Sequence, residues 1–500
     1  GIFAQSVGGG GGLAGSFGND LQGWSNLNAA GSAGAAGAGG VVTIIHTGDI
    51  FTLGNNSHGI FIQSAGGLDD GGKVRLEFKG SIIVEGTNSD AVFVQSAGGG
   101  ANEDMEVTLI NGDVRGGYGS AGVRLRDGAN NTLNNFSAVS TRGDQAVVAG
   151  SGDDIIHNDG RIIGSIDLGS GRNALNNYTA GRLESGPVIN LGVGNPLLNA
   201  GTLAPGGSSR IQQTILTGNL LETSGSKTQF KLGSAVAYDQ LNVTGTARLD
   251  GRLLVARYRG FLPKKADDFT LLIAEEGLTG RFSSVADPLK GNYALQLGLV
   301  YSPDSLTVQT LQDSFLQFAQ TPNQQAVVLN LDAFSGLGTM SGDRRGAALI
   351  EYLNTIPGPM LTVAFDRIAP EELGSTMDSM AGAVSIYSGN TRRRLLELRH
   401  GSAGFGSLTL FDPRGRLDAP WGKAGGGGDW TRKEHSEDDW NVFVYGSGQL
   451  VDVESTGNAE GYNIETGGAT VGVSGGRCLS IGVRGKRCCE SPQAAAPRGR

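Results

Sequence analysis

The chain has 500 residues, of which 85 are glycine and 17% are charged, and its formal net charge at pH 7 is -9. This composition favours many short strands joined by tight turns and argues against an ordinary mixed α/β enzyme. The acidic balance argues against a nucleic-acid-binding protein, because phosphate contacts need clustered Lys and Arg.

The ends of the chain and its cysteines bear on its location. No run of about 18 apolar residues occurs, so we expect no transmembrane helix, and any membrane insertion would use strands. Because the chain opens on Gly1 without an apolar signal segment, we interpret its N-terminus as a cut end.

The three cysteines lie close to the C-terminus: Cys478, Cys488 and Cys489. The absence of earlier thiols fits export through an oxidising periplasm. They have no second His/Cys pair at metal spacing, so we expect no zinc site.

A short segment at the N-terminus recurs twice. Residues 1–6 (GIFAQS) return as 59–64 (GIFIQS) and as 91–96 (AVFVQS), and each copy runs into glycines. Alternating apolar residues predict a strand with one buried face, and the glycines permit the positive φ of a sharp corner.

A second family of repeats follows. Residues 133–138 (LNNFSA) recur as 175–180 (LNNYTA), 150–152 recur as 169–171, and 166–169 recur as 189–192. These spacings indicate an underlying unit of about 20 residues, with the first pair two units apart.

A unit of about 20 residues cannot enclose a core alone, so the copies on either side have to cover its apolar face, and the sequence predicts a stack. Three strands of about five residues with their corners match one turn of a right-handed parallel β-helix. Asn135, Asn158 and Asn177 fall at the same place in successive units. Their amides would either hydrogen-bond along the stack or act as turn residues at left-handed corners, and both interpretations stay open at this point.

Near residue 200 the pattern changes to longer paired strands. The stretch 201–207 (GTLAPGG) holds a Pro-Gly-Gly turn, 217–219 a Thr-Gly-Asn turn, and 239–241 an Asp-x-Leu strand. Over most of 199–256 this order resembles the passenger-associated transport repeat of bacterial autotransporters. Three further segments are similar to the strands that close such a solenoid at its C-terminal end: 269–273, 280–282 and 293–301.

From about residue 311 the periodicity becomes helical. Thr321 and Gln324 have capping-box spacing around Pro322, which predicts a helix start ahead of apolar Val327, Val328 and Leu331. A second start falls at Pro370, Glu371 and Glu372. An apolar stripe then predicts an amphipathic helix: Met380, Val384, Tyr387, Thr391, Leu395 and Leu398. Basic residues near its C-terminal end complement the helix dipole: Arg392, Arg393, Arg394 and Arg399.

Two strands are predicted after a Gly-rich segment that contains Gly425 to Gly428. They span 440–446 and 464–473, with a polar loop around 456–458 between them. In the second strand Ala469, Val471 and Val473 alternate with small or polar residues, which is the pattern of a membrane barrel. These strands resemble the opening of an autotransporter β-domain.

The resemblance fails after Gly476. An autotransporter barrel closes with about twelve strands, and an open edge cannot lie in lipid. Family members also end on an aromatic residue that is absent here. Because residues 477–500 are abruptly basic and Cys-bearing, we hypothesise that they come from a frameshift or truncation. Barrel strands in another reading frame of the downstream DNA would support this hypothesis, and their absence would exclude it.

The predicted fold class is mostly β: a right-handed parallel β-helix (solenoid) passenger, a helical linker, and the first strands of an incomplete outer-membrane β-barrel. The expected divisions are 1–198 for the β-helix passenger repeats, 199–310 for the passenger-associated transport repeat and C-terminal solenoid cap, 311–400 for the helical linker, 401–434 for the Gly-rich hinge, 435–476 for the start of the β-domain, and 477–500 for the atypical tail.

No catalytic, cofactor-binding or metal-binding motif stands out, and we assign no residue to any of these roles. None of the five histidines has metal spacing, and no nucleophile elbow or P-loop occurs. Ser57 and His58 are adjacent, which does not place them for proton transfer. The histidines are His46, His58, His157, His400 and His435.

Three groups of residues are candidates that also have a plainer interpretation. Acidic residues beside glycine could serve catalysis or calcium binding, but they are usually turn formers: Asp153, Asp154, Asp159 and Asp167. Arg142-Gly143-Asp144 would be an integrin-type tripeptide at a loop tip, whereas a solvated turn is the default. The arginines in 392–399 would contact lipid headgroups, or more simply lie at a helix end or in a barrel lumen.

The resemblance implies type V self-secretion, with the passenger carried to the surface of a Gram-negative bacterium as an adhesin or structural stalk. The implied partners are the outer membrane, its barrel-assembly machinery and a host or surface ligand, with no nucleic acid and no cofactor. In the family the helix before the barrel, best matched by 378–400, is threaded through the pore. The solenoid end nearest the membrane, here 199–310, is thought to fold first.

Two competing hypotheses predict different surfaces. A surface β-helix enzyme acting on carbohydrate would need three or more carboxylates or basic groups converging in a groove. An inert structural surface-layer protein would have no specific ligand.

Overall fold

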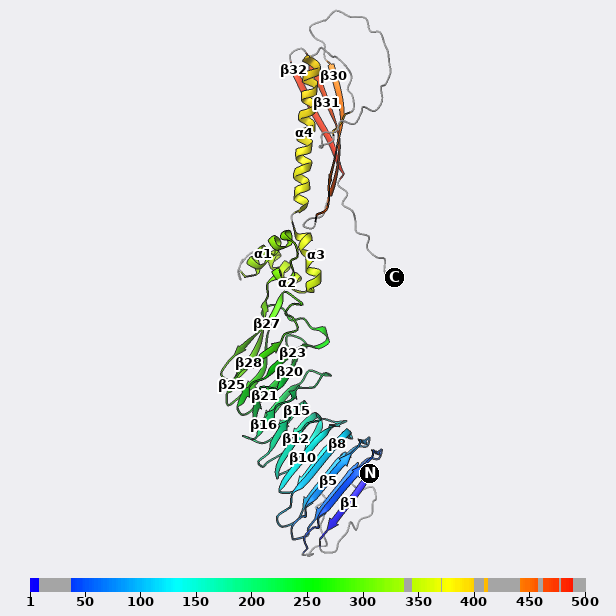
Figure 1. Cartoon of the computed structure of the whole chain (residues 1–500), viewed down its shortest axis with the longest axis vertical. Coiled ribbons are helices and arrows are strands. Elements are labelled where there is room, and N and C mark those ends of the chain that lie inside the picture. Colours follow the sequence, from blue (N-terminus) through cyan, green and yellow to red (C-terminus); the bar gives the residue numbers. More distant parts are fainter. Residues whose placement is uncertain are drawn as a thin grey trace, which may run out of the picture. The chain divides into compact units, whose positions relative to one another are not determined.

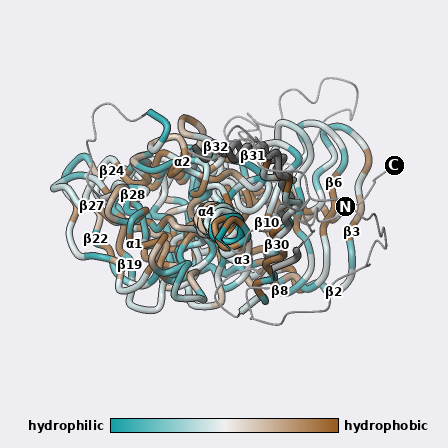
Figure 2. Tube along the Cα trace, turned by 90° about the horizontal axis from the view of Figure 1, so that it is seen from above, coloured by the Kyte–Doolittle hydropathy of each residue, from teal (hydrophilic) through white to brown (hydrophobic). Residues whose placement is uncertain are grey.

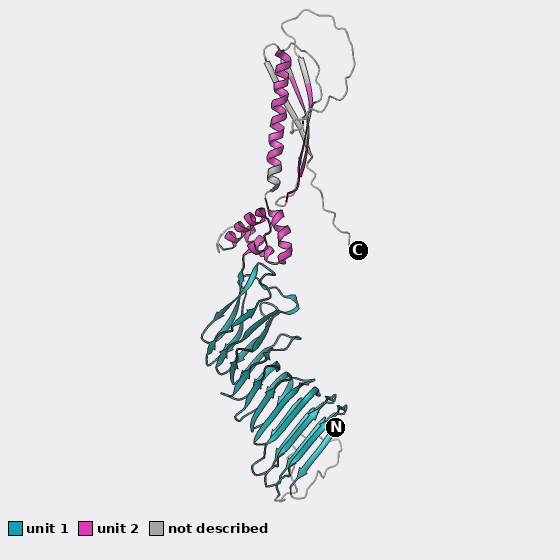
Figure 3. Cartoon of the chain, viewed as in Figure 1, with its two compact units in different colours: residues 1–313 teal, residues 314–500 magenta. Residues whose placement is uncertain are grey.

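The computed structural model describes residues 1–8, 37–336, 344–369, 371–399, 409–411, 441–456, 462–475 and 478–488. The chain divides into two compact units, Gly1–Asp313 and Ser314–Arg500, which Figure 3 shows in teal and magenta. The described part of the chain is mostly β, as predicted, and its elements are labelled in Figure 1. Most of the predicted hinge, Trp440, Gly457, Asn458 and the end of the tail lie outside the described residues.

The first unit contains one 28-stranded sheet in which most neighbours are parallel. Its strands form three ladders, each a series of parallel strands contributed by successive repeats. We refer to each strand position within a ladder as a rung. Strands β8, β10, β13 and β15 are long or bent enough to belong to two ladders.

The first ladder pairs the following strands in order: β1 (Ile2–Val7), β4 (Ile60–Ala65), β7 (Val92–Ala97), β9 (Val123–Asp127), β11 (Gln145–Val148), β13 (Arg161–Asp167), β15 (Arg182–Asn190), β18 (Gln213–Thr217), β21 (Gln240–Val243) and β24 (Asp268–Ala274). The second contains β2 (Val42–Thr47), β5 (Val74–Lys79), β8 (Met105–Gly116), β10 (Asn130–Thr141), β12 (Asp153–Asn158), β14 (Ala174–Asn177), β16 (Pro196–Asn199), β19 (Asn219–Glu222), β22 (Ala247–Leu249) and β25 (Leu278–Gly280).

The third ladder begins with β3 (Ile50–Thr52) and β6 (Ile82–Val84), passes through β8, β10, β13 and β15, and continues with β17 (Thr202–Leu203), β20 (Lys227–Leu232), β23 (Arg252–Arg257) and β26 (Ser284–Ala286). A short 3-10 helix, η2 (Tyr258–Gly260), follows β23. Strands β27 (Leu295–Tyr301) and β28 (Ser305–Gln312) pair antiparallel with each other, and β28 also pairs antiparallel with β24.

The register confirms the repeats read from the sequence. Ile2 pairs with Ile60, and Ile60 pairs with Val92. Leu133 pairs with Ile156, which pairs with Leu175, so the two related segments lie two rungs apart as predicted. The unit of about 20 residues holds for the middle rungs, where Asn158 and Asn177 are 19 residues apart, but not for the last rungs, where Leu241 pairs with Leu272. It is too short for the first rungs, where Gln63 and Gln95 are 32 apart.

Side chains alternate across the ladders between core and surface. In β5, Val74, Leu76 and Phe78 are buried, whereas the residues between them are exposed or half-buried. Figure 2 colours the Cα trace by hydropathy, and short hydrophobic (brown) and hydrophilic (teal) stretches follow one another along it. The buried apolar residues of successive rungs join into one continuous core. The rungs also approach closely at the corners: a Cβ on Gly169, which has a φ of +68°, would lie 2.1 Å from the carbonyl oxygen of Gly150.

The second unit begins with η3 (Phe315–Phe318) and four helices, α1 (Pro322–Gly336), α2 (Arg344–Asn354), α3 (Gly358–Ile368) and α4 (Glu371–Arg399). The predicted capping box is confirmed at α1, because Gln324 N donates to Thr321 Oγ1 (3.2 Å) and Thr321 N donates to Gln324 Oε1 (3.3 Å). No helix in the described part of the chain is long and apolar enough to cross a membrane.

A four-stranded sheet completes the second unit, with β29 (Thr409–Phe411), β30 (Asn441–Val453), β31 (Tyr462–Gly475) and β32 (Cys478–Cys488) in that order. Both predicted strands are present and longer than expected. The expectation of only two strands is wrong, because 478–488 inside the predicted tail pairs antiparallel with β31. Apolar Leu479, Ile481 and Val483 alternate in this segment, which is a strand pattern, but the basic residues after them led to its interpretation as a tail.

Candidate functional site

The Pro-Gly-Gly turn of the 199–256 motif is held by a buried ion pair. Lys231 Nζ donates to the Pro205 carbonyl oxygen (2.7 Å) and to Asp239 Oδ2 (2.5 Å). The side chains of Lys231 and Asp239 are only 4% and 0% exposed. Gly206 and Gly207 have φ values of +64° and +60°, a conformation that glycine adopts at little cost. The turn and the Asp-x-Leu strand, separate in sequence, are therefore joined through Lys231.

Asp239 is the hydrogen-bonding centre of this cluster. Its Oδ1 accepts from the backbone N–H of Gln212 (2.8 Å), and its Oδ2 accepts from that of Lys231 (2.7 Å). Burial raises the pKa of Asp239 to about 6, although Lys231 and the hydrogen bonds oppose this shift. Sequence reasoning missed Lys231, since Phe230, Lys231 and Leu232 are all buried and strict alternation fails there. A charged residue between two apolar ones in a short strand was the available signal.

A second ion cluster lies beside the same turn. Glu184 Oε2 accepts from Arg161 Nη2 (2.6 Å), and its Oε1 accepts from Arg182 Nε (2.5 Å). Burial acts to raise the pKa of Glu184, but the two arginines hold it below its usual value. A Cβ on Gly207 would lie 2.4 Å from Glu184 Oε2, so a side chain there would have to displace this carboxylate and would also have to adopt the φ of +60°.

Buried amides hydrogen-bond from rung to rung in what we name the asparagine stack. Its members are Asn135, Asn158, Asn177, Asn199 and Glu222, each at the C-terminal side of its strand segment in the second ladder. The four successive bonds measure 2.8, 2.7, 2.7 and 2.8 Å. Of the two interpretations left open by the sequence, the stacked amides are thus the observed one, and none of these asparagines has a positive φ.

Two further stacks follow the same plan. In the glutamine stack, Gln5, Gln63 and Gln95 each donate to the next member, and the last bond ends on Asp127 Oδ2 (2.7 Å). In the shortest stack, Asn131 Nδ2 donates to Asp154 Oδ1 (2.8 Å). Asp154 is fully buried, and burial raises its pKa to about 7. The Oδ1 of Asn131 and the Oδ2 of Asp154 are buried without a hydrogen-bond partner, and Asn131 pairs on its other side with apolar Met105.

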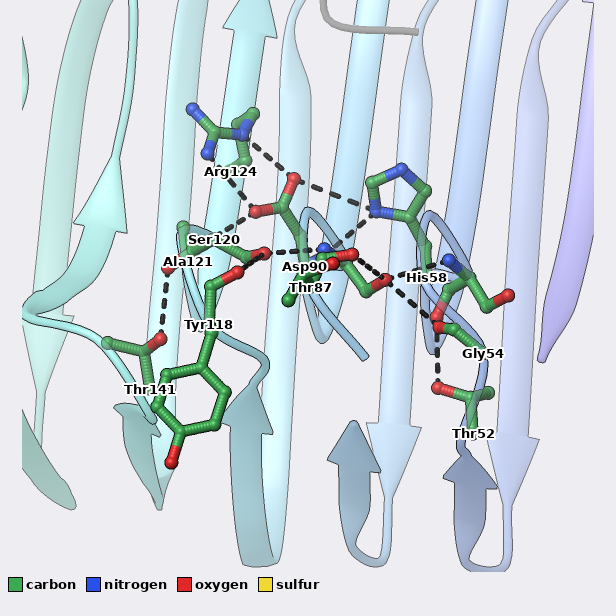
Figure 4. A network of polar contacts seen from close by, with 12 residues as sticks. Thr52, Gly54, His58, Thr87, Asp90, Tyr118, Ser120, Ala121, Arg124 and Thr141 are labelled. Carbon is green, nitrogen blue, oxygen red and sulfur yellow. Dashed lines mark hydrogen bonds and ion pairs between the residues drawn. The ribbon is translucent and has the colours of Figure 1, made fainter. Parts of the chain in front are cut away.

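A polar network crosses the first rungs around Asp90 (Figure 4). Asp90 Oδ2 accepts from Arg124 Nε (2.8 Å), and Oδ1 accepts from Arg124 Nη2 (3.1 Å) and from Ala121 N (2.6 Å). The backbone N–H of Asp90 donates to His58 Nδ1 (3.0 Å). A serine precedes the equivalent position on three successive rungs: Ser57, Ser89 and Ser120. The backbone N–H of Ser57 donates to Ser89 Oγ, and the backbone N–H of Ser89 donates to Ser120 Oγ.

This network is not arranged as a proton relay. Because His58 Nδ1 accepts the Asp90 N–H, it carries no proton to share with the Asp90 carboxylate, which Arg124 already occupies. The Ser57 hydroxyl donates to the Asn55 carbonyl oxygen (3.3 Å) rather than to His58. Burial lowers the pKa of His58, which opposes its charging. The contacts hold successive corners in place.

The four acidic candidates have separate local partners. Asp153 Oδ1 accepts from Arg172 N (2.7 Å), and Asp167 Oδ1 accepts from Asn190 Nδ2 (2.8 Å). Asp154 is buried among the amides, and Asp159 follows β12 at a turn, where its N–H donates to the Asn135 carbonyl oxygen (2.9 Å). Within the described ranges, no three His, Cys, Asp or Glu side chains lie close enough to hold a metal ion.

The Arg-Gly-Asp tripeptide is tied to its neighbours at both charged ends. Arg142 is ion-paired with Glu85 and lies over the Tyr118 ring, with 5.5 Å to the centroid. Asp144 Oδ1 accepts from Arg210 Nη2 (2.9 Å), and its Oδ2 accepts from Ser165 Oγ (3.0 Å). Both charged ends are therefore held by neighbouring residues, with Arg142 and Asp144 half-buried and Gly143 exposed between them.

In the second unit the predicted amphipathic helix α4 contacts the sheet through polar residues. Asn390 Nδ2 donates to Thr470 Oγ1 (3.0 Å), and the Tyr445 hydroxyl donates to Glu397. Arg394 is 1% exposed beside Glu397. The predicted apolar stripe is instead exposed, except that Thr391 is half-buried: Met380, Val384, Tyr387, Leu395 and Leu398.

The two remaining histidines that the structure describes, His46 and His157, each stack on an aromatic ring. His46 stacks on Phe78 at 5.6 Å, and His157 stacks on Tyr178 at 5.6 Å. His400, His435 and Cys489 lie outside the described residues.

No protein-family model and no curated protein sequence matches the chain.

Proposed function

We propose that this chain is part of a bacterial autotransporter: a passenger folded as a right-handed parallel β-helix, followed by a helical linker and the first strands of an outer-membrane β-barrel. The passenger acts at the surface of a Gram-negative bacterium as an adhesin or structural stalk. The observation that carries the proposal is the set of three parallel ladders, in which each strand pairs in register with its equivalent in the next repeat.

Such ladders suit export without an external energy source. Every completed rung offers an unpaired strand edge to the segment that follows, so assembly can proceed one rung at a time once a first rung exists. We assign the start of this process to residues 199–310. The Lys231–Asp239 pair and the Glu184 cluster support that assignment, because they lock a turn and its neighbouring strands with buried, mutually satisfied charges.

The second unit supports the barrel part of the proposal. Tyr445 and Thr470 are buried on the side of the sheet that contacts α4, whereas Val444, Leu450 and Val471 are exposed. Polar groups toward a central helix and apolar groups outward are the arrangement of a barrel wall in lipid. The partners of this proposal are the outer membrane and its barrel-assembly machinery.

An export assay tests the proposal. Residues 1–400 would be placed between a signal peptide and a complete autotransporter barrel in a Gram-negative host. We expect protease-resistant passenger on the cell surface, and protease-sensitive passenger when 199–310 is deleted. A deletion of 59–127, which removes early rungs only, is the matched control and should leave the remaining passenger resistant. Equal resistance of both deletions, or intracellular retention of the undeleted chain, would contradict the proposal.

A further inference from the structure

Three residues of different chemistry lie at the outer corner beside the asparagine stack. Phe136, Asp159 and Tyr178 each follow one of its first three asparagines in the sequence. The backbone N–H of Asp159 donates to the Asn135 carbonyl oxygen (2.9 Å), and that of Tyr178 donates to the Asn158 carbonyl oxygen (2.9 Å). The three residues therefore occupy successive rungs. Phe136 and Tyr178 are 49% and 37% exposed, so two aromatic rings flank a half-buried carboxylate at the surface.

A row of polar side chains runs alongside this corner. Asn134 pairs with His157, and His157 pairs with Asn176; all three are half-buried and alternate with core residues. The His157 and Tyr178 rings are stacked, and the Tyr178 hydroxyl lies 2.8 Å from His157 Nδ1. Asn176 Nδ2, 3.4 Å from the same nitrogen, can only donate. Nδ1 is therefore an acceptor in the neutral ring, and Nε2 carries the hydrogen and is a donor.

Asp159 differs from the other acidic candidates because its carboxylate has no partner in the described part of the chain. Asp153 and Asp167 accept hydrogen bonds from Arg172 N and Asn190 Nδ2. No residue of the described ranges forms a hydrogen bond or an ion pair with the Asp159 carboxylate. A half-buried carboxylate in this position has to take its hydrogen bonds from water or from a bound molecule. It is available as an acceptor between the two rings.

The charges around this surface restrict the kind of partner that fits. The row from Asn134 to Asn176 continues to Leu221 and contains no lysine, arginine or carboxylate before Arg248. A negatively charged partner would approach Asp159 with no cation in this row to offset the repulsion. The surface is also smaller than the about 20 to 30 residues a side of a stable protein interface. Aromatic faces beside hydrogen-bonding groups match a small uncharged molecule that is partly apolar and partly hydroxylated.

We propose that this surface binds an uncharged oligosaccharide. We name its residues the aromatic strip: Asn134, Phe136, His157, Asp159, Asn176 and Tyr178. The inference deepens the proposed function, on which it rests, by giving the adhesin its class of ligand. A pyranose ring has an apolar C–H face that packs on an aromatic ring, and hydroxyls that hydrogen-bond to carboxylate, amide and imidazole groups. Rungs are about 4.8 Å apart, close to the length of one pyranose unit, so two sugar units span the two rungs from Phe136 to Tyr178.

Binding of neutral oligosaccharides to the purified full chain tests the proposal. An array of linear tetrasaccharides of glucose, galactose and mannose supplies the probes, and isothermal titration calorimetry measures the affinity of those that bind. Phe136→Ala and Tyr178→Ala should each weaken binding by about tenfold or more, because each removes a ring face from one sugar unit. Tyr118→Ala is the matched control. Tyr118 is a 53% exposed aromatic residue at another corner, and its loss should leave the affinity unchanged.

A third variant keeps the test decisive if the aromatic variants do not fold. Asp159→Ala removes a side chain at a turn outside the core, and we expect it to weaken binding by about tenfold. Asp159→Asn keeps one acceptor oxygen and should weaken binding less. Absence of binding to every tetrasaccharide, or an equal loss in Tyr118→Ala, would overturn the proposal. A change of oligomeric state in Phe136→Ala, measured by light scattering, would assign the aromatic strip to a second copy of the chain and would also overturn it.

The binding assay separates this inference from the proposed function because it needs no export. Absence of binding together with normal surface display would refute the aromatic strip and leave self-secretion standing. Retained binding together with failed display would refute self-secretion and leave the aromatic strip standing.

Discussion

Strand β5 in the first unit and strands β30 and β31 in the second alternate in the same way, but the two units differ in which residues they expose. In β5 the apolar Val74, Leu76 and Phe78 face the core, and the charged residues between them face outward. In the second unit Tyr445 and Thr470 are buried toward α4, while Val444 and Val471 are exposed. The period of two fixes which residues share a face, and the environment decides which face is covered.

The two units therefore accommodate the polar and apolar side chains of their strands in different ways. The first unit excludes water with apolar side chains and then has to pair every polar group that enters the core, which it does with stacks and ion pairs. In the described part of the second unit, Thr470 and the Tyr445 hydroxyl contact α4, Ile464 is also buried, and Val444, Leu450 and Val471 are exposed, an arrangement suited to an apolar surrounding. Changes to buried polar groups should therefore act on stability in the first unit, and changes to exposed apolar groups should act on association in the second.

The largest effect is expected from Asp239→Ala. The substitution leaves the Lys231 ammonium buried without its carboxylate, which should lower the free energy of unfolding of the first unit by about 3 to 5 kcal/mol. Urea denaturation followed by circular dichroism would measure the loss. The double variant Lys231→Met with Asp239→Leu is the control, and it should recover most of the stability. If Asp239→Ala is as stable as the double variant, the ion pair between Lys231 and Asp239 does not hold the turn in place.

Asp154→Asn should change stability in the opposite direction. Burial raises the pKa of Asp154 from 3.8 to about 7, so the folded state binds the proton more tightly than the unfolded state. The destabilisation by this carboxyl therefore develops as the pH rises from about 4 to 7 and persists above 7. We expect the variant to be more stable by about 4 kcal/mol at pH 8 and nearly equal to the parent near pH 4. Asp153→Asn, on the adjacent half-buried residue, is the matched control for a substitution that removes no buried carboxyl group.

Gly207→Ala should weaken the Pro-Gly-Gly turn by about 2 to 3 kcal/mol, because the new Cβ meets Glu184 in addition to the cost of a positive φ. Gly194→Ala isolates that second cost. Gly194 has a φ of +77° and no atom within 4 Å of an added Cβ, so about 1 kcal/mol is expected. Thermal unfolding of the two variants would measure this difference in stability. Equal losses of stability would show that the contact with Glu184 adds nothing to the cost of the positive φ.

The smallest effect on stability is expected from Val444→Ser combined with Val471→Ser. Both side chains are exposed, so the free energy of unfolding should change by less than about 0.5 kcal/mol. Binding of the chain to nonionic detergent micelles, measured by size-exclusion chromatography with light scattering, should fall. Val236→Ser, at an 89% exposed valine of the first unit, should leave detergent binding unchanged. If Val236→Ser lowers detergent binding as much as the double variant does, the exposed apolar residues of the two units do not differ in their tendency to associate.

Much of the strand arrangement could be predicted because the repeats preserve the alternating pattern, although the number of residues in each repeat varies along the chain. Ile60 and Val92, or Leu133 and Leu175, lie at equivalent rungs, and their similarity reported the register directly. The same repetition exposed three members of the asparagine stack. Asn199 and Glu222 escaped detection because the repeat is degenerate there. Strand β32 was missed because its charges resemble those of a tail.

The sequence by itself determined the alternation of faces, the correspondence of repeats and the capping of α1, since each of these depends on residues close together or copied along the chain. The tertiary structure alone decided which polar groups meet. Lys231 reaches Pro205 across 26 residues, and Glu222 closes a stack whose members are 19 to 23 residues apart. Stacking brings such groups within hydrogen-bond distance, and once water is excluded each has to find its partner on a neighbouring rung.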